Sequence, residues 1–309
     1  MRSEIVAPNG KVLHLGLARG QLADNVLLVG DPARALRVAN RFDRLDCEVR
    51  NREYVTLTGV YNDIPVSVIG TGIGVDNVEI AVIEAYTVAA FDLDRSERLD
   101  AFNLPRFVRI GTSAGVQDAV APGTLAVATY ALGLDNCGLY YDHPAADEVV
   151  VEIERQAYEI VTAATSAGAR FRQKIVPYAS KATPRVAAAL AEQAGQLGMD
   201  CVSGITSATP GFSGPSSRIL EGLSNTVENI KKRLAELRVD DQQVVNMEME
   251  SSLLFHIAAH IGCEVGTICP IISRPTAATA ILDYGPSIEN AISVALAAIE
   301  QLHGEAATE

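Results

Sequence analysis

The stretch Val26-Leu27-Leu28-Val29-Gly30-Asp31-Pro32-Ala33-Arg34 contains the pattern that decides the fold of this chain. Its four apolar residues predict a short buried strand, Gly30 predicts a turn, and the residues after Gly30 predict a helix. A second apolar run over 66–69 also ends at a glycine, Gly70, and a helical pattern over 77–91 follows it. Strand, glycine turn and helix in this order are typical of α/β proteins.

The same alternation continues along the chain. Apolar runs predict further strands over 107–110, 125–128, 174–179, 201–206 and 265–272. Helical spacing of apolar residues predicts further helices over 148–167, 184–197, 225–237, 251–261 and 287–302. The sequence therefore predicts one α/β domain over residues 1–309 with a mostly buried sheet. Segments 91–105 and 209–217 are predicted to be surface loops, and the second is suited to an active-site lid.

The composition limits the partners of this domain. Of 309 residues, 48% are hydrophobic, which is enough for a sizeable core, and the formal net charge is −13. An acidic surface repels nucleic acid and anionic membranes, so neither is an expected partner. Five cysteines without C-x-x-C spacing are expected to be reduced thiols. With no signal-peptide pattern and no apolar stretch long enough for a membrane span, we expect a cytoplasmic protein.

Two glycine turns carry arginines that could bind an anion. Backbone N–H groups at the helix start after Gly30, together with Arg34, form a suitable anion site, although an ordinary turn with a surface arginine is the alternative. Arg109 stands inside an apolar strand, where a buried charge needs a partner, and Gly111 and Thr112 follow it. That partner is either an anion or a carboxylate in a structural ion pair.

The segment Glu248-Met249-Glu250 has the groups that bind a sugar. Carboxylates accept hydrogen bonds from vicinal hydroxyls, and methionine offers an apolar surface to a ring. The alternative is a cluster of acidic residues that caps a helix. Segment 70–74 has G-x-G-x-G spacing, which differs from the dinucleotide fingerprint. His256 and His260 lack the glutamate of a zinc-binding motif, so they are predicted to be helix-packing histidines rather than metal ligands.

Taken in order, six segments of the chain resemble the nucleoside phosphorylase family, and within it the bacterial uridine phosphorylases. They are His14-Leu15-Gly16-Leu17, Gly30-Asp31-Pro32-Ala33-Arg34, Asn51-Arg52-Glu53-Tyr54, Thr71-Gly72-Ile73-Gly74, Arg109-Ile110-Gly111-Thr112 and Glu248-Met249-Glu250-Ser251. The resemblance extends from about His14 to the C-terminal helix. It implies a single-domain, three-layer α/β/α fold with a mixed, partly barrel-like central sheet.

The resemblance also implies a role for each matching residue. The residues that would bind phosphate are Gly30, Arg34, Arg109 and Thr112 of one subunit and Arg52 of a second subunit. The residues that would bind the nucleoside are His14 of the second subunit, Thr112, Phe212, Ser216, Arg218, Glu248, Met249 and Glu250. Glu250 would hold the ribose 2′- and 3′-hydroxyls and His14 the 5′-hydroxyl. Arg34, Arg109 and Arg218 would serve catalysis directly. The site would need at least a dimer, and similar bacterial enzymes are often hexamers.

The implied reaction is the phosphate-dependent cleavage of a nucleoside, with uridine and phosphate giving uracil and ribose 1-phosphate without a metal or an organic cofactor. Arg274, in place of the aspartate of purine-specific members, favours a pyrimidine, whereas Ser216 stands where uridine-specific members carry glutamine. Glu53 and Ile73 match positions that bind potassium in similar enzymes, and Asn77 replaces their serine. The alternatives are a purine nucleoside phosphorylase, a nucleosidase that uses water, and a non-catalytic nucleoside-binding protein.

Overall fold

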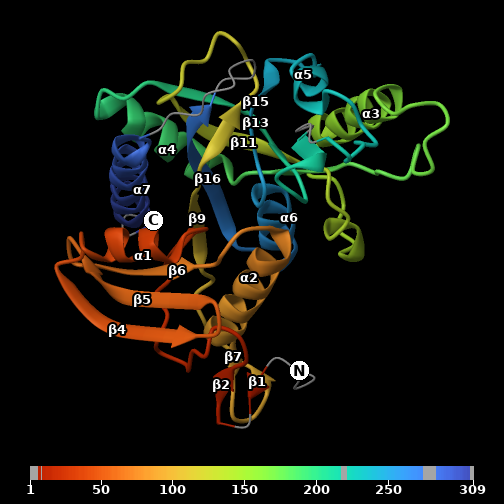
Figure 1. Cartoon of the computed structure of the whole chain (residues 1–309). Coiled ribbons are helices and arrows are strands. Elements are labelled where there is room, and N and C mark those ends of the chain that lie inside the picture. Colours follow the sequence, from red (N-terminus) through yellow and green to blue (C-terminus); the bar gives the residue numbers. More distant parts are fainter. Residues whose placement is uncertain (1–5, 8, 217–220, 274–282, 307–309) are drawn as a thin grey trace.

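A mixed sheet of twelve strands forms the centre of the computed structural model, which describes residues 6–7, 9–216, 221–273 and 283–306 (Figure 1). In spatial order the strands are β12 (Tyr178–Lys181), β11 (Leu125–Gly133), β13 (Cys201–Ala208), β15 (Gln242–Glu248), β10 (Ser113–Gly115), β16 (Glu264–Ser273), β9 (Arg106–Ile110), β3 (Asn25–Val29), β6 (Ile64–Gly70), β5 (Tyr54–Tyr61) and β4 (Arg44–Asn51). The twelfth strand, β14 (Arg238–Val239), pairs with β15 outside this order.

One end of the sheet closes on itself. β11 pairs with β13 in parallel and also with β16 in antiparallel, for example Val127 with Ile268. Together with β15 and β10, these strands form a closed ring, while β9, β3, β6, β5 and β4 continue from β16 as an open sheet. The predicted mixed and partly barrel-like sheet is therefore confirmed. Its long strand β16 joins the two parts, because it pairs with β9 near its start and with β10 near its end.

Helices cover the sheet on both sides. They are α1 (Pro32–Ala39), α2 (Val75–Ala90), α3 (Glu148–Ala163), α4 (Pro184–Gln196), α5 (Ile230–Leu234), α6 (Ser251–Ile261) and α7 (Gly285–Ala306). Helices α4 and α7 pack together beside β16, and α2 and α6 pack together on the other side (Figure 1). This arrangement confirms the α/β/α layers. No helix in the described ranges has the length and apolar character that a membrane span requires.

The strand that the opening stretch predicts, β3, is buried along its whole length. The reason is that parallel strands lie on both sides of it, with Val29 opposite Gly70 of β6 and opposite Ile110 of β9. The carboxyl ends of these three strands therefore meet at one edge of the sheet. Asp31 then caps α1, since its side chain accepts a hydrogen bond of 2.9 Å from the backbone N–H of Ala33.

Most of the predicted elements are confirmed, including α6 at both of its ends. Several predictions were wrong in extent. The helix over 148–167 ends at Ala163, the strand over 125–128 continues to Gly133, the strand over 174–179 is β12, and the helix over 225–237 is the five-residue α5. Segment 91–105 contains a small hairpin of β7 (Phe91–Asp92) and β8 (Glu97–Arg98). The described part of segment 209–217 contains one short 3-10 turn, Gly214–Ser216.

The close packing of the ring makes one glycine sensitive to substitution. A Cβ at Gly204 of β13 would lie 2.7 Å from the carbonyl oxygen of Gln243 and 2.7 Å from Cγ1 of Val245. We expect Gly204→Ala to lower the free energy of unfolding by about 1–3 kcal/mol, because neighbouring strands must move apart. Urea denaturation measures this change. Gly195→Ala is the matched control, since nothing lies within 4 Å of its Cβ on α4, and equal stability of the two variants would contradict the prediction.

Candidate functional site

The turns after β3, β6 and β9 lie against one another at the shared edge of the sheet. The backbone N–H of Thr71 donates to the carbonyl oxygen of Val29 over 2.8 Å, and a Cβ at Gly30 would lie 3.3 Å from the carbonyl oxygen of Gly72. Gly72 and Gly74 both have positive φ, so the turn after β6 depends on glycine. Crevices at the carboxyl ends of parallel strands are the usual ligand sites of α/β proteins.

Arg109 of β9 is buried at this edge, and its side chain is 5% exposed. Its Nη1 lies 3.1 Å from Oε2 of Glu248, and its Nη2 hydrogen-bonds the carboxylate of Glu250. Burial opposes the charge of Arg109, but Glu250 and Glu248 outweigh it and raise the pKa of Arg109 above its usual value. The sequence left an anion or an ion pair open as the partner of Arg109, and the ion pair is present.

The two carboxylates are held by backbone N–H groups as well as by Arg109. Glu248 accepts hydrogen bonds from the N–H groups of Glu250 (3.1 Å) and Ser251 (3.0 Å), and Glu250 accepts one from Gly74 (2.8 Å). Burial raises the pKa of Glu248 to about 7, against the effect of Arg109 and with that of Glu250. These bonds join the turn after β6, strand β9 and the start of α6 into one polar group.

Arg34 of α1 is the second buried arginine of this edge. Its Nη1 donates to the carbonyl oxygen of Ile110 over 2.9 Å, two residues before Thr112. Burial and the charge of Arg109 both lower the pKa of Arg34. Two positive groups that repel each other in a buried place favour an anion between them. The contacts at this edge involve the predicted residues Gly30, Arg34, Arg109, Glu248, Met249 and Glu250. The predicted Thr112 lies in the turn directly after β9.

His14 and Arg52 belong to a separate group. His14 bonds Glu84 of α2, and Asn51 donates to the carbonyl oxygens of Leu13 and His14 over 3.0 and 2.8 Å. Arg52 is exposed at the turn of the β4–β5 hairpin, directly after Asn51. Glu84 lies ten residues beyond Gly74 on α2, which corresponds to about 15 Å along a helix. Within the described residues, no hydrogen bond or ion pair joins His14 or Arg52 to Arg109 or Glu250.

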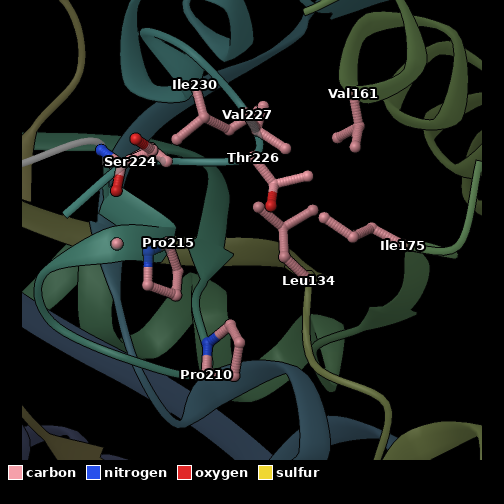
Figure 2. Close-up of a pocket in the computed structure, with 11 residues that line it drawn as sticks. Leu134, Val161, Ile175, Pro210, Pro215, Ser224, Thr226, Val227 and Ile230 are labelled. Atoms are coloured by element: carbon pink, nitrogen blue, oxygen red, sulfur yellow. The ribbon is translucent and has the colours of Figure 1, made fainter. Parts of the chain in front are cut away.

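The predicted base-binding loop borders a cavity. The cavity has a volume of about 330 Å³, and Figure 2 shows its largely apolar lining. The lining includes Pro210, Gly214 and Pro215 of the loop, Leu134 after β11 and Ile230 of α5. None of the charged residues around Arg109 lines this cavity. The cavity is therefore separate from the charged group around Arg109.

The remaining predicted residues are placed in part. Phe212 is 64% exposed on this loop, and Ser216 ends its 3-10 turn. Arg218 and Arg274 lie outside the described residues. His256 packs against neighbouring elements as predicted, because its Nε2 lies 2.7 Å from the carbonyl oxygen of Tyr141 and its Nδ1 has Ser180 as partner. His260 is exposed, and its ring contacts that of His143. In the described ranges, His, Cys, Asp and Glu side chains form no group that could hold a metal ion.

Sequence reasoning missed Glu84, although the sequence contains a signal for it. Glu84 lies in the apolar pattern of the helix predicted over 77–91, beside Ala85, and the helix buries it. A carboxylate in such a position needs a partner, as Arg109 does in its strand. The partner, His14, is 70 residues away in the chain, so only the fold could reveal it.

Comparison with known proteins identifies the chain as a member of an enzyme superfamily. The chain belongs to the phosphorylase superfamily, whose sequence model matches residues 24–302, and within it to the nucleoside phosphorylase family. It is 28% identical to a uridine phosphorylase of Thermococcus kodakarensis, over 86% of this chain and 78% of that protein. It is 25% identical to a uridine phosphorylase of Escherichia coli, over 86% of this chain and 87% of that protein.

A solved structure supports the same family. It is that of a Trypanosoma brucei nucleoside phosphorylase that shows uridine phosphorylase activity. It matches the present structure with a TM-score of 0.87 at 26% identity, over 96% of this chain and 99% of that chain. The family and the fold implied by the six sequence segments are thereby confirmed.

The raised pKa of Glu248 predicts how stability depends on pH. Between the ordinary carboxyl pKa of 4.5 and about 7, the folded chain binds more protons than the unfolded chain. The free energy of unfolding should therefore fall as pH rises through this window. Glu248→Gln removes the titrating group, so we expect a smaller loss of stability between about pH 5 and about pH 8, measured by urea denaturation without phosphate.

A surface carboxylate provides the control for this measurement. Glu289 pairs with Arg37 and Arg41, and burial raises its pKa less than these arginines lower it. Glu289→Gln should therefore keep the pH dependence of the unmodified protein over the same window. An unchanged pH dependence in Glu248→Gln would show that Glu248 does not titrate there.

Proposed function

We propose that this protein cleaves the N-glycosidic bond of uridine with inorganic phosphate and releases uracil and ribose 1-phosphate. The observation that carries the proposal is the adjacent pair of buried arginines, Arg34 and Arg109, beside the carboxylates of Glu248 and Glu250. The names of the relatives support uridine as the substrate. We place the enzyme in the cytoplasm, as a homo-oligomer built from dimers.

Phosphate would bind between the two arginines. Its negative charge offsets the repulsion that lowers the pKa of Arg34, and the backbone at Gly30 and the hydroxyl of Thr112 complete the site. A phosphate oxygen then attacks C1′ of the ribose as the bond to the base breaks. The electron pair of that bond leaves with the base, which takes up a proton from solvent. Fixed position and electrostatic stabilisation supply the acceleration.

The ribose would bind at the carboxylates. Glu250 accepts from the 2′- and 3′-hydroxyls, Glu248 supports it, and Met249 contacts the sugar ring. Because Arg109 hydrogen-bonds Glu250, the same guanidinium can contact the phosphate and hold the carboxylate that orients the sugar. Positive charge that develops on the ribose in the transition state is then flanked by the phosphate dianion and by these carboxylates.

A second subunit would complete the site. His14 and Arg52 lie together, and His14 bonds Glu84 about 15 Å along α2 from Gly74, the backbone donor to Glu250. Such a spacing suits two residues that serve a neighbouring subunit, His14 at the 5′-hydroxyl and Arg52 at the phosphate. We expect a dimer as the smallest active form and a hexamer of three dimers as the larger one.

The base would be held by Phe212, Ser216 and Arg218. A serine hydroxyl at position 216 offers fewer hydrogen bonds than the amide of glutamine, so contacts to uracil depend more on Arg218. Among the alternatives, a nucleosidase that uses water has no need for Arg34 and Arg109 together. A purine nucleoside phosphorylase and a non-catalytic nucleoside-binding protein make different predictions in the assay below.

The first test is release of free base from uridine, thymidine, inosine and adenosine, with and without phosphate. We expect uridine to be cleaved, and only with phosphate present, because the two arginines bind the attacking group. Cleavage of inosine or adenosine in preference to uridine would indicate a purine enzyme, and cleavage without phosphate a nucleosidase. No release from any of the four nucleosides would favour the binding protein.

The second test is complementation between two inactive variants. Arg109→Ala suits this purpose poorly, because it leaves Glu248 and Glu250 buried without their ion-pair partner and should destabilise the fold. Arg52→Gln changes an exposed side chain, and Glu250→Gln keeps the size of the side chain. Each variant alone should lose most activity. Subunits co-expressed in equal amounts should recover about a quarter of it, since half of the dimers are mixed and each mixed dimer has one intact site.

The mixed dimers also distinguish shared from unshared sites. If Arg52 served the site of its own subunit, every site in a mixed dimer would carry one of the two substitutions. Activity would then stay at the level of the separate variants, which would contradict the shared site while leaving the reaction itself in place.

A further inference from the structure

Glu84 is a buried carboxylate that takes no part in the proposed contacts to phosphate or ribose. Its side chain is 3% exposed on α2, and His14 is its side-chain hydrogen-bond partner. A carboxylate in such a place is costly unless its oxygens are hydrogen-bonded. The segment around His14 supplies those bonds, so the two elements stabilise each other.

The bonds around Glu84 determine which ring nitrogen of His14 carries a proton. The backbone N–H of His14 donates to Oε1 and Oε2 of Glu84 over 2.9 and 3.0 Å, and that of Leu15 donates to Oε2 over 2.7 Å. A carboxylate that accepts hydrogen bonds from two backbone N–H groups is favoured in its ionised form. Nδ1 of His14 lies 2.7 Å from Oε1, so Nδ1 must donate its hydrogen there.

Nε2 of His14 is then the nitrogen that remains for another molecule. In a neutral imidazole with its hydrogen on Nδ1, Nε2 is a hydrogen-bond acceptor. The His14 side chain is 29% exposed, and no hydrogen bond in the described part of the chain involves Nε2. The backbone is held from both sides, since Glu84 binds its N–H groups and Asn51 binds the carbonyl oxygens of Leu13 and His14.

We propose that Glu84 is a positioning residue of the nucleoside site: it fixes the Nδ1–H form of His14 and presents Nε2 as the acceptor for the 5′-hydroxyl of a ribose bound in the neighbouring subunit. This inference rests on the proposed function. Glu84 itself touches no substrate. It acts through His14 by setting the tautomer, the ring orientation and the backbone position together.

The substitution Glu84→Gln tests this inference because it changes hydrogen-bonding roles at nearly constant size. The amide oxygen can accept from the backbone N–H groups, but the amide nitrogen then faces Nδ1 as a second donor. His14 must respond by moving its hydrogen to Nε2, which turns the acceptor for the 5′-hydroxyl into a donor. ¹⁵N NMR of histidine-labelled protein reports the tautomer directly, and His14→Ala identifies the His14 signals among the five histidines.

The kinetic readout compares uridine with 5′-deoxyuridine, which lacks the 5′-hydroxyl. We expect Glu84→Gln to lower kcat/KM for uridine by roughly five- to tenfold and to leave 5′-deoxyuridine within about twofold. In a His14→Ala background, Glu84→Gln should have no further effect, because the two residues act through one contact. Glu154→Gln is the matched control, since Glu154 of α3 accepts a hydrogen bond of 2.9 Å from the backbone N–H of Ala179. This variant should leave kcat/KM unchanged for both nucleosides.

Several results would overturn the inference. They are an equal loss for both nucleosides, additive effects of Glu84→Gln and His14→Ala, and hydrogen on Nε2 of His14 in the unmodified protein. The last measurement needs no variant, so it applies even if Glu84→Gln fails to fold. Absence of phosphate-dependent cleavage by the unmodified protein would instead reject the proposed function. Equal cleavage of uridine by His14→Ala and the unmodified protein would overturn the role of His14 and with it this inference, while the proposed reaction would stand.

Discussion

The ion group of Arg109 with Glu248 and Glu250 is the interaction on which the rest of the site depends. A buried guanidinium is stable only with partners, and here these come from the segment between β15 and α6, with Gly74 holding Glu250 from the turn after β6. Three chain segments far apart in sequence are thereby fixed at one sheet edge. In the proposed function this group also contacts both substrates, Arg109 the phosphate and the two carboxylates the ribose.

The fold provides this edge through parallel pairing. β3 lies between β6 and β9, so the turns after these strands are neighbours, and β16 links them to the closed ring that contains β15. The ring brings the carboxyl end of β15 beside that of β9, although about 140 residues separate Arg109 from Glu250. The group of Arg109, Glu248 and Glu250 is therefore positioned by β9 and β15, which suits a mechanism that depends on fixed charges.

How far the sequence could predict the structure depended on how local each signal was. The apolar run 26–29 and the apolar pattern of α6 were sufficient to predict these elements, because a segment that is buried on most sides is apolar along its own sequence. The helix predicted over 225–237 was wrong because Asn229 takes a left-handed backbone conformation and α5 starts only at Ile230. β12 starts after Pro177, which has no N–H to donate to a sheet. Contacts such as Glu84 with His14 required the tertiary fold.

The sequence analysis predicted neither strand of the β4–β5 hairpin. For β4 the reason is that it is largely exposed and carries alternating charges in place of an apolar run. Arg44 pairs with Asp46 and Arg50 with Glu48 along this outermost strand. An outer strand with free backbone groups can otherwise add strands from other chains without limit. The same charges that obscure β4 in the sequence thus protect the protein from aggregation at that edge. Any assembly of this chain would then form through side chains rather than by extension of the sheet at β4.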